Sequence, residues 1–219
     1  PNAVAIGYGA GHQGQYYNAI AIGQTAGQNN QQGQSVAIGN SAGQNNQGAN
    51  SVSLGMQAGQ YSQGQGNVAI GNQAGNTGQL DTAVAIGQYA GQNNQQYSSV
   101  AVGSSAGNNN QGANAIAIGN SSGSNSQSND AIAIGNSSGN YSQGTYGIAL
   151  GTDAGQYSQG YSSISIGFAS GQNSQGSASI GIGYGAGSNY QFDNTIAIGL
   201  LAGKNSQGTS AIAIGSNSG

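Results

Sequence analysis

The residues that could do acid–base or metal chemistry in this 219-residue chain are few and far apart. The carboxylates are Asp81, Asp130, Asp153 and Asp193, and the chain has one histidine, His12, one cation and no cysteine. Glycoside hydrolysis needs two carboxylates within about 10 Å of each other, and a zinc site needs three or four converging ligands. Serine is frequent, but a nucleophilic serine needs a neighbouring base. We therefore predict no catalytic residue, no metal site and no cofactor, and expect a protein that is not an enzyme.

The feature that must position every side chain is a repeat of sixteen residues. Glycine recurs at this interval from Gly7 to Gly215, fourteen times and without an insertion. A fixed period of this length is typical of a supersecondary unit stacked on itself. We call each repeat a coil and number its positions so that Gly7 is at position 7.

Each coil contains a short pattern that predicts a β-strand. Positions 4 and 6 are always Val, Ile or Leu, as in Val4 and Ile6, while positions 3 and 5 are mostly Ala or Ser. Strict alternation with β-branched residues on one parity is typical of a strand. A second, weaker strand is expected within positions 10–15. The predicted fold is an all-β solenoid (β-roll) with 16 residues per coil and about 14 coils, forming one continuous domain over residues 1–219.

The alternation also suggests an inside and an outside. We expect the larger residues of positions 4 and 6 to form the core, because apolar side chains are usually buried. The small residues of positions 3 and 5 would then form a flat, uncharged outer face suited to assembly. The residues proposed for this flat assembly face are Ala19, Ala21, Ala83, Ala85, Ala115, Ala117, Ala131, Ala133, Ala211 and Ala213.

Position 15 is glutamine in every coil that contains it. A glutamine at one phase can form a ladder, since its amide both donates to and accepts from the residues one coil away. A glutamine that bonds a turn, or a row that recognises a polar ligand, would show the same pattern. The residues of this structural ladder are Gln15, Gln31, Gln47, Gln63, Gln79, Gln95, Gln111, Gln127, Gln143, Gln159, Gln175, Gln191 and Gln207.

The charge of the chain limits its partners. A net charge of −3 with a single cation argues against nucleic acid, because binding to phosphates needs clusters of Lys and Arg. No apolar run reaches the roughly 18 residues of a membrane span, so no membrane insertion is expected. Low net charge also removes self-repulsion. The most favoured partner is therefore another copy of the chain, in a homo-oligomer or a polymer.

The phrases Ser35-Val36-Ala37-Ile38-Gly39 and Asn50-Ser51-Val52-Ser53-Leu54-Gly55 resemble the head repeats of trimeric autotransporter adhesins. That resemblance implies a β-roll that trimerises and binds a cell-surface or matrix receptor. Similar glycine-rich repeats occur in viral and phage fibres. A looser similarity is to curli-type functional amyloid repeats, on the pattern of Gln207-Gly208 followed by Ala211. All of these imply an extracellular location, on a cell or virion surface.

The favoured function is that of a structural building block of an extracellular fibre, filament or fibrous adhesin. We expect assembly through the flat Ala/Ser face and through end coils that lack a polar cap. One alternative is a trimeric adhesin head that binds a surface receptor. Another is an ice-binding solenoid that uses the flat face, although Thr195 is the only threonine at positions 3 and 5.

Overall fold

The computed structural model describes residues 2–219 and consists of short parallel strands and turns, with no helix among those residues. The strands build a parallel β-solenoid of about 13 turns with about 16 residues in each turn. The predicted all-β solenoid is thereby confirmed, and the expected number of about fourteen coils is close. The chain divides into two compact units, Pro1–Asn110 and Gln111–Gly219. The single continuous domain stays a prediction, and each unit is described by itself.

Every strand is three residues long, and each coil contributes two of them except the last, which contributes one. In the first unit the first strands of the coils are β1 (Val4–Ile6), β3 (Ile20–Ile22), β5 (Val36–Ile38), β7 (Val52–Leu54), β9 (Val68–Ile70), β11 (Val84–Ile86) and β13 (Val100–Val102). The second strands are β2 (Gln13–Gln15), β4 (Asn29–Gln31), β6 (Asn45–Gln47), β8 (Tyr61–Gln63), β10 (Thr77–Gln79) and β12 (Asn93–Gln95). Strand β14 (Asn109–Gln111) spans the division between the units.

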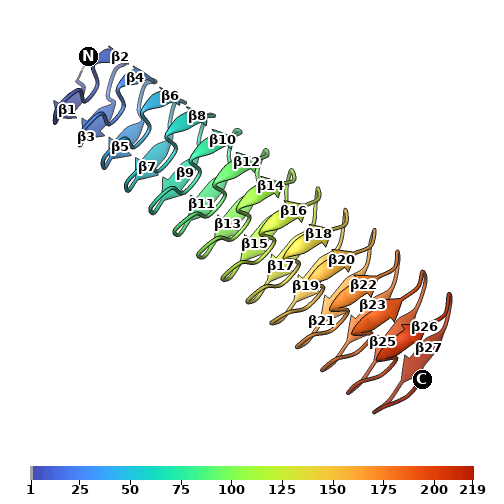
Figure 1. Cartoon of the computed structure of the whole chain (residues 1–219). Helices are drawn as coiled ribbons and strands as arrows, with labels where there is room; N and C mark the ends of the chain where they lie inside the picture. Colours follow the sequence, from blue (N-terminus) through green and yellow to red (C-terminus); the bar gives the residue numbers. More distant parts are fainter. Residues whose placement is uncertain (1) are drawn as a thin grey trace. The chain divides into compact units, whose positions relative to one another are not determined.

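The second unit repeats the arrangement. Its first strands are β15 (Ile116–Ile118), β17 (Ile132–Ile134), β19 (Ile148–Leu150), β21 (Ile164–Ile166), β23 (Ile180–Ile182), β25 (Ile196–Ile198) and β27 (Ile212–Ile214). Its second strands are β16 (Asn125–Gln127), β18 (Tyr141–Gln143), β20 (Tyr157–Gln159), β22 (Asn173–Gln175), β24 (Asn189–Gln191) and β26 (Asn205–Gln207). In Figure 1 the odd-numbered strands of each unit lie in one row and the even-numbered strands in another.

We call the odd-numbered strands the aliphatic sheet and the even-numbered strands the amide sheet. In the aliphatic sheet all three residues pair with those one coil away, as Val4 does with Ile20. In the amide sheet only the first and third residues pair, as in Thr77 with Asn93. The middle residue usually has a left-handed backbone, with φ of 54° at Asn94. Asn and Ser dominate this position because a left-handed backbone is costly for bulkier residues.

The invariant glycine at position 7 makes the close stacking of the coils possible. At Gly7 the φ angle is +126°, a region that only glycine adopts easily. A Cβ added there would lie 2.6 Å from the carbonyl oxygen of Gly23 in the next coil. The Gly23 N–H in turn donates to the Ile6 carbonyl at 2.8 Å. Any side chain at position 7 would therefore push two coils apart and break their hydrogen bonds.

The core is made of small residues and glutamine, and the expectation that positions 4 and 6 form it is wrong. The side chains of positions 3, 5 and 10 are buried almost throughout, and the glutamines of position 15 are buried beyond the first coil. The space inside a coil is narrow: a Cβ on Gly75 would lie 2.5 Å from Gln79 Oε1 and 3.2 Å from the Ala69 methyl group. A β-branched residue in place of that alanine would have no room, so the larger aliphatic residues point outward.

The predicted flat assembly face is wrong for the same reason. Alanine faces inward because the narrow space between the two sheets favours small side chains at positions 3 and 5, although it also holds Asn67 and Thr195 at position 3. Nine of the ten proposed residues are buried, and Ala211, which lies in the last coil, is half-buried. The buried residues are Ala19, Ala21, Ala83, Ala85, Ala115, Ala117, Ala131, Ala133 and Ala213.

Candidate functional site: an aliphatic outer face

The outer side of the aliphatic sheet carries two rows of Val, Ile and Leu, from positions 4 and 6. Within each triplet after β1 the middle residue is buried and the two flanking residues are half-buried or exposed, while all three residues of β1 are exposed. Leu54 is 42 % exposed and Ile118 is 38 % exposed. We call this surface the aliphatic face. In the first unit it comprises Val4, Ile6, Ile20, Ile22, Val36, Ile38, Val52, Leu54, Val68, Ile70, Val84, Ile86, Val100 and Val102. In the second unit it comprises Ile116, Ile118, Ile132, Ile134, Ile148, Leu150, Ile164, Ile166, Ile180, Ile182, Ile196, Ile198, Ile212 and Ile214.

The residues of the aliphatic face stack in register. Ile38 pairs with Leu54, and Leu54 with Ile70, so that each side chain lies between its counterparts of the coils before and after. In the inner coils this stacking buries more than half of each residue and leaves the outer part of its side chain in water. No position in the two rows carries a charge or a hydrogen-bonding side chain. The result in each unit is a continuous apolar surface without a polar residue inside it.

The aliphatic face of each unit is in the size range of the largest apolar patch on a typical soluble monomer, about 300–600 Å². Seven strands about 4.8 Å apart, with two outward rows, cover roughly 300–400 Å² in each unit. Soluble monomers rarely expose a contiguous apolar patch of more than a few hundred Å², and such patches often mark interaction sites. The face is therefore the strongest candidate for a functional surface in each unit.

The glutamines of position 15 lie beneath this surface, in the core, and the prediction of ladder hydrogen bonds is confirmed. The Gln63 amide donates to Gln79 Oε1 at 3.1 Å, and the Gln191 amide donates to Gln207 Oε1 at 2.9 Å. Equivalent bonds join Gln127 to Gln143 and Gln159 to Gln175. The direction of these side chains, which the sequence left open, is inward.

Most of the hydrogen bonds that these glutamine amides donate join the two sheets. Gln127 Nε2 donates to the Ile116 carbonyl at 2.8 Å and to the Ala131 carbonyl at 3.1 Å. Both carbonyls belong to positions 3 and 4, at the start of the aliphatic strands. The buried amide thus satisfies backbone groups of the aliphatic sheet from the side of the amide sheet.

Some of the buried glutamine carbonyl oxygens have no hydrogen-bond partner, including Gln47 Oε1 and Gln159 Oε1. Where position 5 is serine, its hydroxyl donates a hydrogen bond to a glutamine carbonyl oxygen. Ser53 Oγ donates to Gln63 Oε1 at 2.8 Å, and Ser165 Oγ donates to Gln175 Oε1 at 2.5 Å. A serine at position 5 is thus a partner of the glutamine ten residues later in the chain.

The four aspartates have structural partners. Asp81 Oδ1 accepts the Gln65 N–H and Asp193 Oδ1 accepts the Ser177 N–H, both at 2.8 Å and one coil back. Asp130 accepts from the Asn114 amide, and Asp153 accepts from the Gln156 amide. Among residues 2–219 no three His, Cys, Asp or Glu side chains come together.

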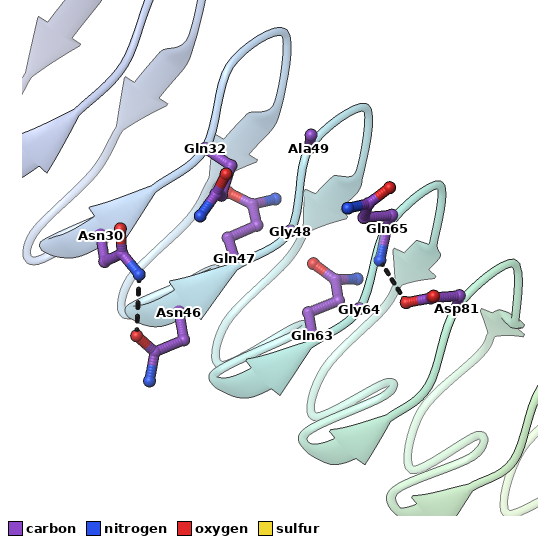
Figure 2. Close-up of a pocket in the computed structure, with 10 residues that line it drawn as sticks. All are labelled: Asn30, Gln32, Asn46, Gln47, Gly48, Ala49, Gln63, Gly64, Gln65 and Asp81. Atoms are coloured by element: carbon purple, nitrogen blue, oxygen red, sulfur yellow. Dashed lines mark hydrogen bonds between the residues drawn. The ribbon is translucent and has the colours of Figure 1, made fainter.

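A shallow pocket of about 250 Å³ lies at the turns of the first unit and is shown in Figure 2. The glycines at position 16, Gly48 and Gly64, leave space there, and two hydrogen bonds lie at the rim of the pocket. These are the hydrogen bond from the Asn30 amide to Asn46, at 3.1 Å, and the one that Asp81 accepts from Gln65. The lining is polar and has a single carboxylate, so it offers no acid–base pair. The residues that line it are Asn30, Gln32, Asn46, Gln47, Gly48, Ala49, Gln63, Gly64, Gln65 and Asp81.

The signal that could have identified the aliphatic face is side-chain size. Sixteen residues form two strands and their turns in one coil, so the sheets approach closely and only the smaller parity fits between them. The ice-binding alternative depended on the opposite assignment. The residues of positions 3 and 5 that an ice-binding surface would need, Thr195 included, are almost all buried.

Comparisons of the chain with protein-family models, with curated proteins and with solved structures find no match. The likeness to adhesin heads, fibre repeats and curli-type repeats therefore remains a prediction from a phrase of five or six residues. Within residues 2–219 no helix is long and apolar enough to cross a membrane.

Proposed function

We propose that the chain is a structural repeat protein that assembles with further copies of itself through the aliphatic face. The observation that carries the proposal is the pair of outward Val/Ile/Leu rows, in which Leu54 and Leu150 are 42 % and 41 % exposed. Covering these rows removes apolar surface from water, at roughly 25 cal/mol for each Å². Assembly therefore has a driving force that the folded single chain does not use.

The area available fits a modest specific interface. The face of each unit offers roughly 300–400 Å², against about 800 Å² per partner in a standard interface. One unit alone supplies about half of that area. We infer that a stable complex requires contacts along the aliphatic faces of both units, or more than two copies.

The chemistry of the face favours a second copy as the occupant. A partner must present an uncharged aliphatic surface, because the rows contain no group that could pair with a polar side chain. A second copy has this surface, with ridges at the same strand spacing, and two such sheets can pack face to face. The net charge of −3 gives little repulsion between copies.

The assembly that we favour is an extracellular fibre, filament or fibrous adhesin. The resemblance of the coil phrase to adhesin-head and fibre repeats supports that location and a possible receptor on a cell surface or in a matrix. The alternative is a trimeric head, in which three aliphatic faces close around one axis. An open polymer grows with concentration, whereas a closed trimer has one mass.

The test is sedimentation velocity over a range of concentrations, with electron microscopy of the same samples. We expect the wild type to associate. Leu54→Lys should weaken association by roughly 10- to 100-fold, which is about 1.4–2.8 kcal/mol, because the interface would then bury an unpaired ammonium group.

The matched control is Tyr61→Lys, which adds the same charge to the amide sheet of the same unit. Tyr61 is 43 % exposed, close to the exposure of Leu54, and should be replaced without loss of association. A wild type that stays monomeric at every concentration would refute the proposal. Equal weakening by both substitutions would show that charge, and not the aliphatic face, controls association. Filaments would support the fibre, and a single trimeric mass would support the closed head.

A further inference from the structure

We propose that Tyr141 and Tyr157 form a site of oxidative cross-linking, at which a dityrosine bond joins two neighbouring coils. Both residues open a strand of the amide sheet and pair with each other in register. Their rings are parallel, with an interplanar angle of 6° and centroids 5.3 Å apart. They are 47 % and 43 % exposed, so a small oxidant reaches both phenols.

The composition of the chain directs one-electron oxidation to tyrosine. The chain has twelve tyrosines, a single methionine, no tryptophan and no cysteine. No thiol can compete for the oxidant, and no disulfide can join coils covalently. A covalent link between coils of this protein therefore has to use another side chain, and the phenol is the one that couples after losing an electron.

The pair at Tyr141 and Tyr157 differs from the other ring contacts of the same unit. Tyr146 and Tyr161 meet edge to face, at 82° and 5.6 Å, with one ring directed at the other's plane. Phe168 and Tyr184 are stacked at 5.1 Å, but one of the two rings has no phenol. Only the first pair combines two phenols with parallel planes.

The reaction balances with hydrogen peroxide activated by a haem peroxidase as the oxidant. Each phenol loses one electron and one proton and becomes a phenoxyl radical. The two radicals form a carbon–carbon bond between ring carbons ortho to the oxygens. Each of these carbons then gives up its hydrogen, which moves to the phenoxyl oxygen and restores the phenol. The two electrons and two protons lost in total reduce one hydrogen peroxide to two molecules of water.

The backbone supplies the proximity that the coupling needs. Parallel strands hold neighbouring residues of one row about 4.8 Å apart. The two radicals therefore meet within one molecule, at an effective concentration far above that of a second chain.

The experiment treats the full chain with a haem peroxidase and hydrogen peroxide and follows the fluorescence of dityrosine. Leu54→Lys serves as the background, so that association through the aliphatic face does not create contacts between chains. The test then succeeds or fails independently of the assembly proposal. The expected product is a monomer that has lost two hydrogen atoms. Because the chain has a single Lys and no Arg, a protease of broad specificity should be used to find the linked peptide.

The deciding comparison is between Tyr157→Phe and Tyr61→Phe. Tyr61 occupies the same position of its coil and is also 43 % exposed, but its neighbours in the row are Asn45 and Thr77. We expect Tyr157→Phe to abolish the linked peptide and to lower the rate of intramolecular coupling at least about tenfold, while Tyr61→Phe changes neither.

Three results would overturn the proposal. One is a linked peptide that joins other tyrosines and never Tyr141 to Tyr157. Another is an equal rate in both variants. A product with twice the mass of the chain, without the intramolecular link, would also contradict it, since the tyrosines would then react between chains.

Discussion

The two sheets of each unit direct different kinds of side chain into the core and toward solvent. The aliphatic sheet turns alanine inward and Val, Ile or Leu outward, while the amide sheet turns glutamine inward and Asn, Ser or Tyr outward. The aliphatic strands pair at three residues and the amide strands at two. The difference shows how the narrow interior is filled: a short side chain from one sheet leaves space for a long amide from the other. It also leaves the large aliphatic residues free to contact a partner.

The largest effect on stability should come from placing a charge on the buried side of the aliphatic sheet. Ala117→Asp places a carboxylate in the fully buried row, and we expect it to lower the free energy of unfolding by at least about 3 kcal/mol. The neighbouring Ile118 is 38 % exposed, so Ile118→Asp places its carboxylate at the water surface and should cost less, about 1–2 kcal/mol of lost apolar burial. Thermal unfolding followed by circular dichroism measures both. If the outward substitution destabilised the protein more, our assignment of the core would be wrong.

A smaller loss should follow from removing the amide that joins the sheets. Gln127→Leu keeps the length of the side chain but removes the amide that donates to the Ile116 and Ala131 carbonyls and to Gln143 Oε1. The Ala131 carbonyl keeps the Ile116 N–H, whereas Gln143 Oε1 would be unpaired in the core, so we expect a cost of about 2–3 kcal/mol in denaturant unfolding. The control is Asn173→Ala, which removes a half-buried amide that donates to Asn189 at 2.9 Å on the outer side. It should cost about 0.5–1 kcal/mol. A similar loss in both would mean that the inward glutamine has no special role.

A gain in stability is expected when a coil that has alanine at position 5 receives the serine that other coils have there. Ala37→Ser puts a hydroxyl ten residues before Gln47, whose Oε1 has no partner, in the arrangement that Ser53 has with Gln63. We expect the free energy of unfolding to rise by about 1 kcal/mol. The reverse change, Ser53→Ala, should lower it by a similar amount. Stabilisation by neither serine would show that the unpaired oxygen costs nothing in this core.

The smallest effect concerns the turns that both sheets share. Ala178 has a φ of 53°, where a Cβ is unfavourable. Ala178→Gly should therefore raise stability by about 0.5 kcal/mol, since glycine adopts this backbone without strain. Ala113→Gly, in a turn outside the left-handed region, should lower it by a similar amount. Melting temperatures that move in the same direction for both variants would contradict this interpretation.

The repeat made the fold predictable but not its inside and outside. The period of Gly7 and the alternation around Val4 and Ile6 place the strands of the aliphatic sheet correctly. An alternating pattern defines two faces without saying which one is buried. The greater hydrophobicity of positions 4 and 6 predicts that their face is buried, whereas the structure places it on the outside. The distance between the sheets decides which face is buried, and it follows from turns whose left-handed residues, such as Tyr89 and Ala178, have no common sequence signal.

The glutamines illustrate the same limit. Their constant phase predicted hydrogen bonds along a row, and Gln63 and Gln79 form one. Their bonds to backbone carbonyls of the other sheet depend on how the chain turns at Gly75 and the equivalent glycines, where the amide fills the space of a missing side chain. Such contacts across a coil leave no mark in a single sequence.

The register of the aliphatic face has a consequence for how two copies could align. Its ridges are nearly identical from coil to coil, so sliding one copy past another by a whole coil recreates almost the same contacts. The offset between copies must then be set by the few ridges that differ. Leu54 in the first unit and Leu150 in the second interrupt rows that are otherwise Ile or Val. In the assembly that we propose, these two leucines would help to fix the offset between copies, and exchanging both for isoleucine should permit alignments shifted by whole coils.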